Sequence, residues 1–324
     1  MGAALPLSGS LAPLGKEFRD GMMLALEDYR LANGEQGKLV TLTIGDDHGD
    51  VLKTANIIDG YLKERFHLFF APLTDLGTKR IVSKIQKSGK PVVRLLRSGN
   101  AGSKIPTVAI SSHDQGVILA QFANRYLGSR SATIIADAGD AHESAVSSAF
   151  VALFNGKAKK LTKEEYLEGK KLSLSDDIMM IPGSYQFANK VLGTQGGATE
   201  YPTYFLGTDL WDSPGFRKVL SPKAKVAFVV NYAIDSPKYG SFADLYQRKY
   251  RGEPTTATFI GYSAVKRVLM LFSKLQSNRA EILKKALDQE FSTSLGKNSG
   301  ATVVFSKKGQ LFSVPDNYFL SPSP

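Results

Sequence analysis

Polar residues directly follow most of the short apolar runs in this chain, and their types suit the binding of a small charged molecule. Hydroxyl groups and free backbone N–H groups at a helix start suit a carboxylate, whereas an aspartate backed by aromatic rings suits an ammonium group. The residues in these positions are Ser8, Ser10, Thr74, Asp75, Arg97 and Ser98 in the first part of the chain, and Asp137, Asp140, Tyr185, Asp209 and Trp211 in the second. The pattern predicts two half-sites of opposite character, which together suit an amino acid-like ligand; the alternative is that each residue only caps a helix.

The turn after the first apolar run does not match a nucleotide-binding loop. In GSLAPLGKE, Gly9 and Gly15 are one residue too far apart, and Glu17 stands where Ser or Thr would bind magnesium. A serine nucleophile is not indicated either, because no base accompanies Ser8 in this motif and the nearest approach to GxSxG, residues 261–265, lacks the second glycine. We therefore predict that the protein is not an enzyme.

The histidines and acidic runs do not have the spacing of a metal site. His142 and Glu143 begin an HExxH pattern, but Val146 stands in place of the second histidine. The DDHGD run at 46–50 begins like a calcium loop, yet Ile57 stands where the bidentate carboxylate is required. We expect no metal and no cofactor, and interpret the run as a strand-ending turn that caps the next helix.

Composition indicates a globular chain. The 324 residues are 43% hydrophobic and 22% charged, and no apolar run approaches the roughly 20 residues that cross a bilayer. Cysteine is absent, which excludes disulfides and thiolate chemistry. The formal net charge is +11, but the densest basic cluster, residues 157–171, contains interleaved glutamates and no reading motif, so we expect a solvated surface and no nucleic acid partner.

Short apolar runs alternate with helical patterns of 12 to 18 residues. We expect strands at 40–44, 67–71, 91–96, 107–110, 132–136, 177–181 and 203–207. The helical stripes predict burial of Phe18, Met22, Ala25, Leu26 and Tyr29 in the opening helix, and of Val51, Ala55, Ile58, Leu62 and Phe66 in the second. Continuous apolar strands between helices favour an α/β fold with a mostly parallel sheet covered on both faces.

The alternation occurs in two series, which predicts two lobes. The first series ends near residue 111, the second runs to about 236, and a helical block at 241–289 and a hairpin at 301–314 follow. We expect lobe 1 to contain residues 1–111 and 237–298, and lobe 2 to contain residues 112–236 and 299–324. The chain would then cross between the lobes more than once.

Five motifs occur in an order that resembles a known superfamily. They are LPLSGSLAPLGKEFRDGMMLALED, IGDDHGD, SSHDQGVILAQFA, YFLGTDLWDSPGF and FADLYQRKYRGEPTTATFIGYSAVKRVLMLF. Together they cover nearly the whole chain and are similar to the type I periplasmic-binding proteins, the receptors for branched-chain amino acids and amides. The resemblance implies two doubly wound parallel-sheet lobes joined by a three-strand hinge, closing on a small ligand that transport members present to a membrane ABC permease.

The resemblance also implies roles for single residues. Ser10 and Thr74, with the turn formed by Leu96, Arg97 and Ser98, would hold the ligand carboxylate. Tyr185 would line the second lobe, Asp209 would pair with the ammonium group, and Asp114 stands at the hinge-proximal acidic position.

The chain departs from the family pattern at three places. Ala141 or His142 stands where an aromatic ring is usual, and of these we predict His142 as a ligand contact. Leu14 stands where the first loop often has an aromatic ring. Arg94 and Arg97 favour an additional acidic group on the ligand, unless they are surface residues. The connection at about 168–177 is short, either because the crossover itself is short or because residues are missing from it.

A sister branch of the superfamily offers a second interpretation. GTDLWDSP and DSPKYGSFADLYQRKY also resemble the receptor-like domain of penicillin-binding-protein activators, lipoproteins that act on peptidoglycan synthases. The partner would then be a peptidoglycan synthase rather than a permease. Both branches imply a periplasmic or extracellular location, with a lipid anchor as the alternative to a free protein, and Met1 directly before an apolar strand suggests a trimmed N-terminus.

Overall fold

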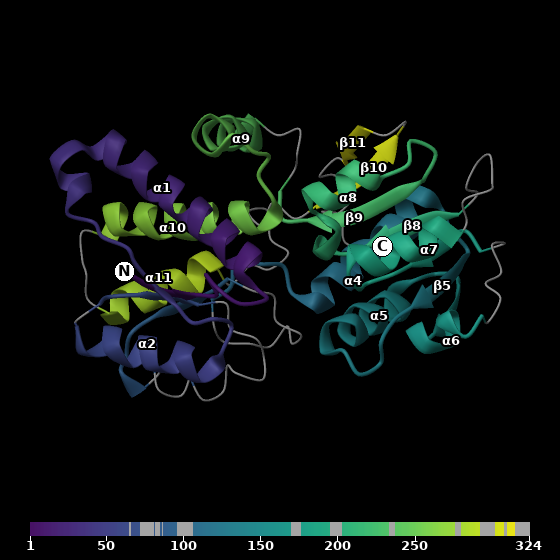
Figure 1. Ribbon diagram of the computed structural model, residues 1–324, viewed down its shortest axis with the longest axis horizontal. Coiled ribbons are helices and arrows are strands. Elements are labelled where there is room, and N and C mark those ends of the chain that lie inside the picture. Colours follow the sequence, from purple (N-terminus) through teal and green to yellow (C-terminus); the bar gives the residue numbers. More distant parts are fainter. Residues whose placement is uncertain are drawn as a thin grey trace. The chain divides into compact units, whose positions relative to one another are not determined.

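A computed structural model describes residues 1–64, 66–71, 81, 85, 87–95, 106–169, 176–194, 203–232, 237–275, 280–291, 302–307 and 310–314. The chain divides into two compact units, each with its own sheet and helices (Figure 1). Unit 1 comprises Met1–Ser98, Gly102–Ala109 and Phe242–Ser294, and unit 2 comprises Gly99–Ala101, Ile110–Ser241 and Leu295–Pro324.

Unit 1 contains a parallel four-stranded sheet in the order β2-β1-β3-β4. Its strands are β1 (Gly2–Leu5), β2 (Thr43–Asp46), β3 (Phe69–Ala71) and β4 (Val92–Arg94). Because β1 lies between β2 and β3, the strand order reverses at β1, which makes the carboxyl end of β1 a topological switch point.

Two of the predicted strands of this unit are wrong or too long. The strand expected at 40–44 begins only at Thr43, because Leu39 and Val40 donate their N–H groups to Gln36 and Gly37 and so complete the preceding helix. The strand expected at 107–110 is reduced to one bridge between Arg94 and Thr107. There the chain turns at once into a helix that Ser111 caps.

Unit 1 includes the helices α1 (Ala12–Lys38), α2 (Val51–Lys63), α10 (Thr256–Leu275), α11 (Ala280–Phe291) and most of α9 (Pro237–Tyr250). The three C-terminal helices confirm the helical block predicted from the sequence. Helices α1 and α10 lie side by side (Figure 1), in contact at two glycines. A Cβ atom on Gly21 would lie 1.9 Å from the Thr258 carbonyl oxygen, and one on Gly261 would lie 2.3 Å from that of Phe18. Only glycine allows these two backbones to approach so closely.

The helical stripes are largely as predicted. In α1, Phe18, Met22, Ala25 and Leu26 are buried, and Tyr29 is half-buried. In α2, Ala55 and Ile58 are buried, but Val51 is 40% exposed at the helix start. Asp50 caps α2 by accepting the N–H groups of Leu52 and Lys53, as expected for the end of the acidic run.

Unit 2 contains a seven-stranded sheet in the order β11-β10-β9-β8-β7-β5-β6. Its strands are β5 (Ser131–Ile135), β6 (Lys157–Leu161), β7 (Ile178–Met180), β8 (Tyr204–Gly207), β9 (Val226–Val230), β10 (Thr302–Lys307) and β11 (Gln310–Ser313). The first five are parallel, and β10 and β11 form the predicted antiparallel hairpin. The order reverses at β5, which lies between β6 and β7, so this sheet also has a switch point.

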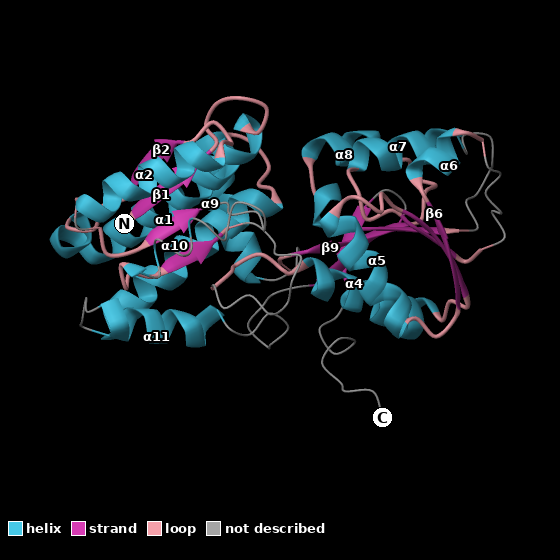
Figure 2. Cartoon of the chain, turned by 90° about the horizontal axis from the view of Figure 1, so that it is seen from below, coloured by secondary structure: helices cyan, strands magenta, loops and turns pink. Residues whose placement is uncertain are grey.

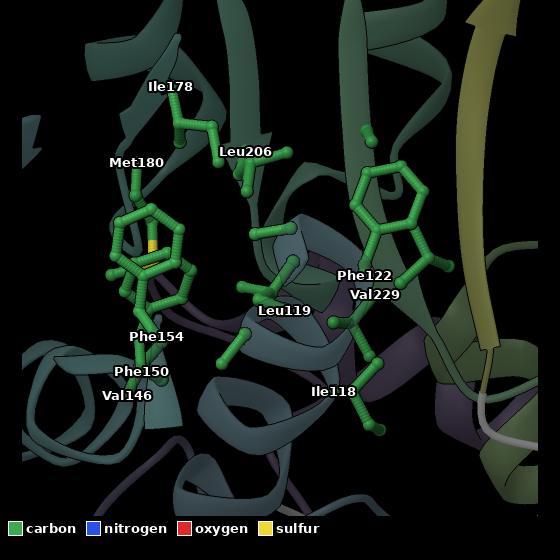
Figure 3. Close-up of a cluster of buried hydrophobic side chains, with 14 of the residues drawn as sticks. Ile118, Leu119, Phe122, Val146, Phe150, Phe154, Ile178, Met180, Leu206 and Val229 are labelled. Carbon is green, nitrogen blue, oxygen red and sulfur yellow. The ribbon is translucent and has the colours of Figure 1, made fainter. Parts of the chain in front are cut away.

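Helices cover both faces of this sheet (Figure 2), as expected for a mostly parallel sheet. One face carries α4 (Ser112–Gln121), its continuation η1 (Phe122–Leu127) and α5 (Ala141–Leu153); the other carries α7 (Tyr185–Thr194) and α8 (Pro214–Val219). Figure 3 shows the core between α4, α5 and the strands, built from Ile118, Leu119, Phe122, Val146, Phe150, Phe154, Ile178, Met180, Leu206 and Val229. Gly116 lets α4 approach α5, since a Cβ atom there would lie 2.3 Å from the Val146 carbonyl oxygen.

The edge strand β6 carries the basic cluster, and its lysines 157, 159 and 160 are exposed, which fits a solvated surface. The crossover from β6 toward β7 contains the five-residue helix α6 (Lys163–Leu167), whose start is stabilised by a capping box between Thr162 and Glu165. In the part of the chain that the structure describes, no helix is both long and apolar enough to cross a membrane.

Candidate functional site

The first candidate site is the carboxyl edge of the unit 1 sheet, where the β1–α1 loop carries Ser8 and Ser10. The loop is fixed by Asp46 at the end of β2. Leu7, Ser8 and His48 donate backbone N–H groups to Asp46 Oδ1 at 2.9, 3.2 and 2.9 Å. The bond from the His48 N–H group, followed by the Ser8 side chain and the Leu7 N–H group, lowers the pKa of the Asp46 carboxyl to about 2, so it stays ionised.

The hydroxyl of Ser8 has a partner that the sequence motif did not indicate. Ser8 Oγ is hydrogen-bonded to His48 Nδ1, and the same ring nitrogen lies 3.8 Å from Asp46 Oδ2. The prediction that no base lies near Ser8 was therefore wrong. In a catalytic triad the serine and the aspartate contact opposite nitrogens of the histidine, whereas both contact Nδ1 in this cluster, so the geometry does not support a proton relay.

Ser10 is the serine of this loop that faces solvent. Its side chain is exposed, and Leu11, which precedes α1, makes no side-chain capping bond. The Ser10 hydroxyl can therefore donate a hydrogen bond to a carboxylate, whereas the Ser8 hydroxyl is already hydrogen-bonded to His48.

Five other predicted residues of this half-site lie outside the described residues: Thr74, Asp75, Leu96, Arg97 and Ser98. Arg94, at the end of β4, is only 1% exposed. The alternative that it is a surface residue is therefore wrong.

The second candidate site is the carboxyl edge of the unit 2 sheet, beginning with the first turn of α4. Ser111 caps the helix by accepting the N–H group of Asp114 at 3.0 Å. Asp114 is 5% exposed, and its Oδ1 lies 3.5 Å from His113 Nδ1. Its Oδ2 is buried and has no hydrogen-bond partner among the described residues. A donor from a ligand would satisfy this oxygen.

Gln115 and His142 connect α4 to the other loops of this edge. Gln115 Oε1 accepts the N–H group of Asp209 at 3.1 Å. His142 Nδ1 lies 2.8 Å from Ser112 Oγ, and its Nε2 lies 3.4 Å from Thr208 Oγ1. The histidine therefore joins α4, α5 and the end of β8.

The partner of Thr208 determines which nitrogen of His142 carries the proton. Thr208 Oγ1 donates to the Pro182 carbonyl oxygen at 2.9 Å, so it can only accept from His142. A neutral His142 then carries its hydrogen on Nε2 and accepts the Ser112 hydroxyl at Nδ1. We conclude that His142 positions the surrounding loops, because both ring nitrogens are already used within unit 2.

Asp209 and Trp211 lie in the single turn η2 (Asp209–Trp211), which Thr208 caps. Asp209 is 6% exposed. Trp211 is fully buried, its Nε1 donates to the Gly183 carbonyl oxygen at 3.1 Å, and a Cβ atom on Gly207 would lie 2.1 Å from its ring. The prediction that Trp211 contacts the ligand is therefore wrong, because the ring is part of the core and supports the turn that carries Asp209.

Tyr185 begins α7 at the same edge and is half-buried. Its ring centroid lies 6.1 Å from that of Phe216, and a Cβ atom on Gly215 would lie 2.6 Å from its hydroxyl. Tyr185 therefore packs on the start of α8 and keeps one side accessible.

The edge of unit 2 thus gathers polar side chains from the start of α4, the start of α5 and the end of β8, beside the switch point at β5. Sequence reasoning missed Ser112, Gln115 and Thr208, although all three lie in the SSHDQG and GTDLW motifs. Two buried carboxylates beside hydroxyl, amide and imidazole groups suit a ligand that donates hydrogen bonds or carries positive charge. Among the described residues, no group of three or more histidine, aspartate or glutamate side chains could hold a metal ion.

Two doubly wound α/β units with this chain order define the type I periplasmic-binding-protein fold, and comparison with solved structures confirms it. The substrate-binding protein LivJ of the branched-chain amino acid transporter of Streptococcus pneumoniae, in complex with isoleucine, superposes with a TM-score of 0.77 at 18% identity, covering 97% of this chain and 98% of that chain. The leucine-binding protein LivK of Thermotoga maritima gives 0.74 at 21% identity, covering 97% of each chain.

A third structure shows that this fold accepts other ligands. An ABC transporter solute-binding protein of R. palustris in complex with benzoate gives a TM-score of 0.70 at 16% identity, covering 97% of this chain and 94% of that chain. No protein-family model matches the sequence, and no curated protein matches it.

Proposed function

We propose that the chain is the substrate-binding protein of an ABC transporter and that its ligand is a small, polar, amino acid-like molecule. The observation that carries the proposal is the gathering of polar groups beside the switch point of unit 2, where open α/β sheets bind ligands. The full-length likeness to transporter binding proteins supports it. The proposal includes a membrane permease as partner and an extracytoplasmic location.

Two buried carboxylates favour a ligand that carries an ammonium group. Asp114 and Asp209 are 5% and 6% exposed, and burial of an ionised group is costly unless a donor or an opposite charge accompanies it. The buried Oδ2 of Asp114 has no such donor within the described residues. An ammonium group bound at this edge would supply one.

In unit 1, the proposed role is recognition of the ligand carboxylate. Ser10 is exposed at the start of α1, and the first turn of α1 contains no acidic residue that would repel an anion. The roles proposed for Thr74, Asp75 and the turn at 96–98 rest on the sequence resemblance.

The proposal is tested by calorimetry and thermal shift with the common L-amino acids, their amides and benzoate. A ligand that binds only the folded protein should stabilise it by about 2.7 kcal/mol at a hundredfold excess over Kd. The Asp209→Asn variant should weaken binding of an amino acid by about tenfold or more, because it removes the charge that pairs with the ammonium group. Binding of benzoate, which has no ammonium group, should not change.

Asp244→Asn is the matched control, since Asp244 is exposed on α9. This variant should bind like the wild type. If no compound of the panel stabilises the protein, the receptor proposal is refuted; if Asp209→Asn binds amino acids like the wild type, Asp209 is not the ammonium partner. We do not propose the peptidoglycan-synthase partner, because no contact of the described residues favours it.

A further inference from the structure

A buried polar cluster begins three residues after Asp209 and is not explained by ligand binding. It consists of Asp212, Arg217, Tyr232 and Tyr239, and we call it the Asp212 cluster. The Asp212 side chain is fully buried. Its Oδ1 accepts from Arg217 Nη2 at 2.6 Å, and its Oδ2 accepts from the Tyr232 hydroxyl at 2.7 Å. Each carboxylate oxygen therefore has a donor.

The cluster joins four segments of unit 2. Asp212 follows η2, Arg217 lies on α8, Tyr232 follows β9, and Tyr239 lies in the first turn of α9. The rings of Tyr232 and Tyr239 are stacked, with centroids 4.1 Å apart and an interplanar angle of 5°. They are 2% and 8% exposed. The stack thus connects the end of the sheet to the start of α9.

Asp212 is also tied to the turn that carries Asp209. The N–H group of Asp212 donates to the Asp209 carbonyl oxygen at 3.2 Å, and that of Trp211 donates to Thr208 at 3.0 Å. The buried Trp211 ring, bonded to Gly183, fixes the middle of the turn. Because the turn is one short hydrogen-bonded unit, a shift of Asp209 must displace Asp212.

The charges of the cluster are stable. Burial is the largest single effect on Arg217 and opposes its charge, but the Asp212 carboxylate, the neighbouring tyrosine hydroxyls and the hydrogen bond to Asp212 together outweigh burial and raise the pKa of the guanidinium. Burial, followed by the Asp212 charge, raises the pKa of Tyr232 well above its usual value. The guanidinium therefore remains charged and the Tyr232 phenol neutral over the physiological range, so these two groups do not act as a pH switch.

The Asp212 cluster contacts the start of α9, and this helix belongs to both units of the chain. Its first residues, up to Ser241, belong to unit 2, and from Phe242 on it belongs to unit 1. We propose that the Asp212 cluster couples the conformation of the Asp209 turn to the start of α9, the helix through which the chain passes from unit 2 to unit 1. The ligand-dependent part of this proposal rests on the proposed function; the coupling itself does not.

The coupling is tested without ligand by hydrogen exchange and mass spectrometry. Tyr232→Phe removes the hydroxyl that donates to Asp212 and keeps the ring that stacks on Tyr239. Exchange should become about tenfold faster or more in two segments together, 208–213 and 241–245, because a hydrogen bond to a charged group is lost. Tyr204→Phe is the matched control: Tyr204 lies on β8 beside Lys225, outside the cluster, and both segments should exchange as in the wild type.

Two results of the ligand-free experiment would overturn the proposal. One is faster exchange in only one of the two segments; the other is a uniform increase throughout unit 2, which would show that the cluster only stabilises the unit. Arg217→Lys, which keeps the charge and loses the guanidinium geometry, serves as a second variant if Tyr232→Phe does not fold. It should produce the same paired change.

A ligand found in the calorimetric panel adds a second arm. In the wild type it should slow exchange in both segments, and in Tyr232→Phe it should slow exchange at 208–213 only. Equal protection of 241–245 in both proteins would contradict coupling through the cluster. If no compound binds, the proposed function fails, while the ligand-free experiment still decides the coupling.

Discussion

Replacing Gly116 by alanine tests the link between core packing and the candidate site in unit 2. Gly116 faces α5, and an added Cβ atom would lie 2.3 Å from the Val146 carbonyl oxygen, 2.8 Å from Ala149 Cβ and 3.1 Å from the Phe150 nitrogen. Two of these atoms belong to the backbone of α5, so no side-chain rotation relieves the contact. The helices must separate.

The size of the separation sets the expected effect. A carbon atom approaches a carbonyl oxygen to about 3.3 Å, so the helices must move apart by about 1 Å. A gap of this size forfeits a quarter to a half of each dispersion contact across it, and overpacked cores lose roughly 1–3 kcal/mol. We expect a loss of about 3 kcal/mol, since the core of Figure 3 is built on α4 and α5. Ser112 and Gln115 would also move away from His142 and Asp209, so ligand affinity should fall as well.

Urea unfolding followed by tryptophan fluorescence measures this effect. Trp211 is the one tryptophan of the sequence and is fully buried in unit 2, so its emission reports that unit. Gly193→Ala in α7 is the control, because nothing lies within 4 Å of the added Cβ atom, and alanine there should stabilise by up to about 1 kcal/mol. If Gly116→Ala unfolds at the same urea concentration as the wild type, the close approach of α4 and α5 is not as described.

Two further predictions concern a helix cap and alkaline pH. Ser111→Ala should cost unit 2 about 1 kcal/mol, whereas Ser111→Gly should cost only about a few tenths, as measured by Trp211 fluorescence in urea; equal losses would contradict the capping role. Burial raises the pKa of Tyr246 to about 12, against about 10 in the unfolded chain. Between these two pH values the unfolded chain binds fewer protons than the folded protein, so the free energy of unfolding falls as pH rises. Urea unfolding followed by circular dichroism between about pH 9 and 12 should show this fall, and a Tyr246→Phe variant with the same slope as the wild type would exclude a contribution from this phenol.

Much of the fold could be predicted from the chain because its signals are local. The apolar runs at 67–71, 177–181 and 203–207 contain strands β3, β7 and β8, and the run at 132–136 overlaps all but the first residue of β5. The α1 stripe is buried at Phe18, Met22, Ala25 and Leu26. Asp50 caps α2 as its position before the helical pattern indicated. Periodicity and capping depend on neighbouring residues, so both can be recognised without the tertiary structure.

The errors have a common cause, which is competition from distant partners. The apolar run at 107–110 did not become a strand, because its last residue donates to Asn231, 121 positions away, and a helix begins directly after it. The motif predicted Trp211 as a ligand contact, but its ring is buried in the core and its Nε1 donates to the Gly183 carbonyl oxygen. Such contacts are fixed by the packing of the whole unit.

The sequence by itself determined that the chain alternates strands and helices, that polar residues follow the strands, and that its motifs occur in the order typical of type I periplasmic-binding proteins. Only the tertiary structure decided what those polar residues do. In the structure Ser8 is hydrogen-bonded to His48, and His142 connects Ser112 to Thr208. One oxygen of Asp114 has no partner among the described residues. Asp212 accepts hydrogen bonds from Arg217 and Tyr232. The physical reason is that hydrogen bonds are short and directional, so the partner of a polar group depends on which loops the sheet brings together at its edge.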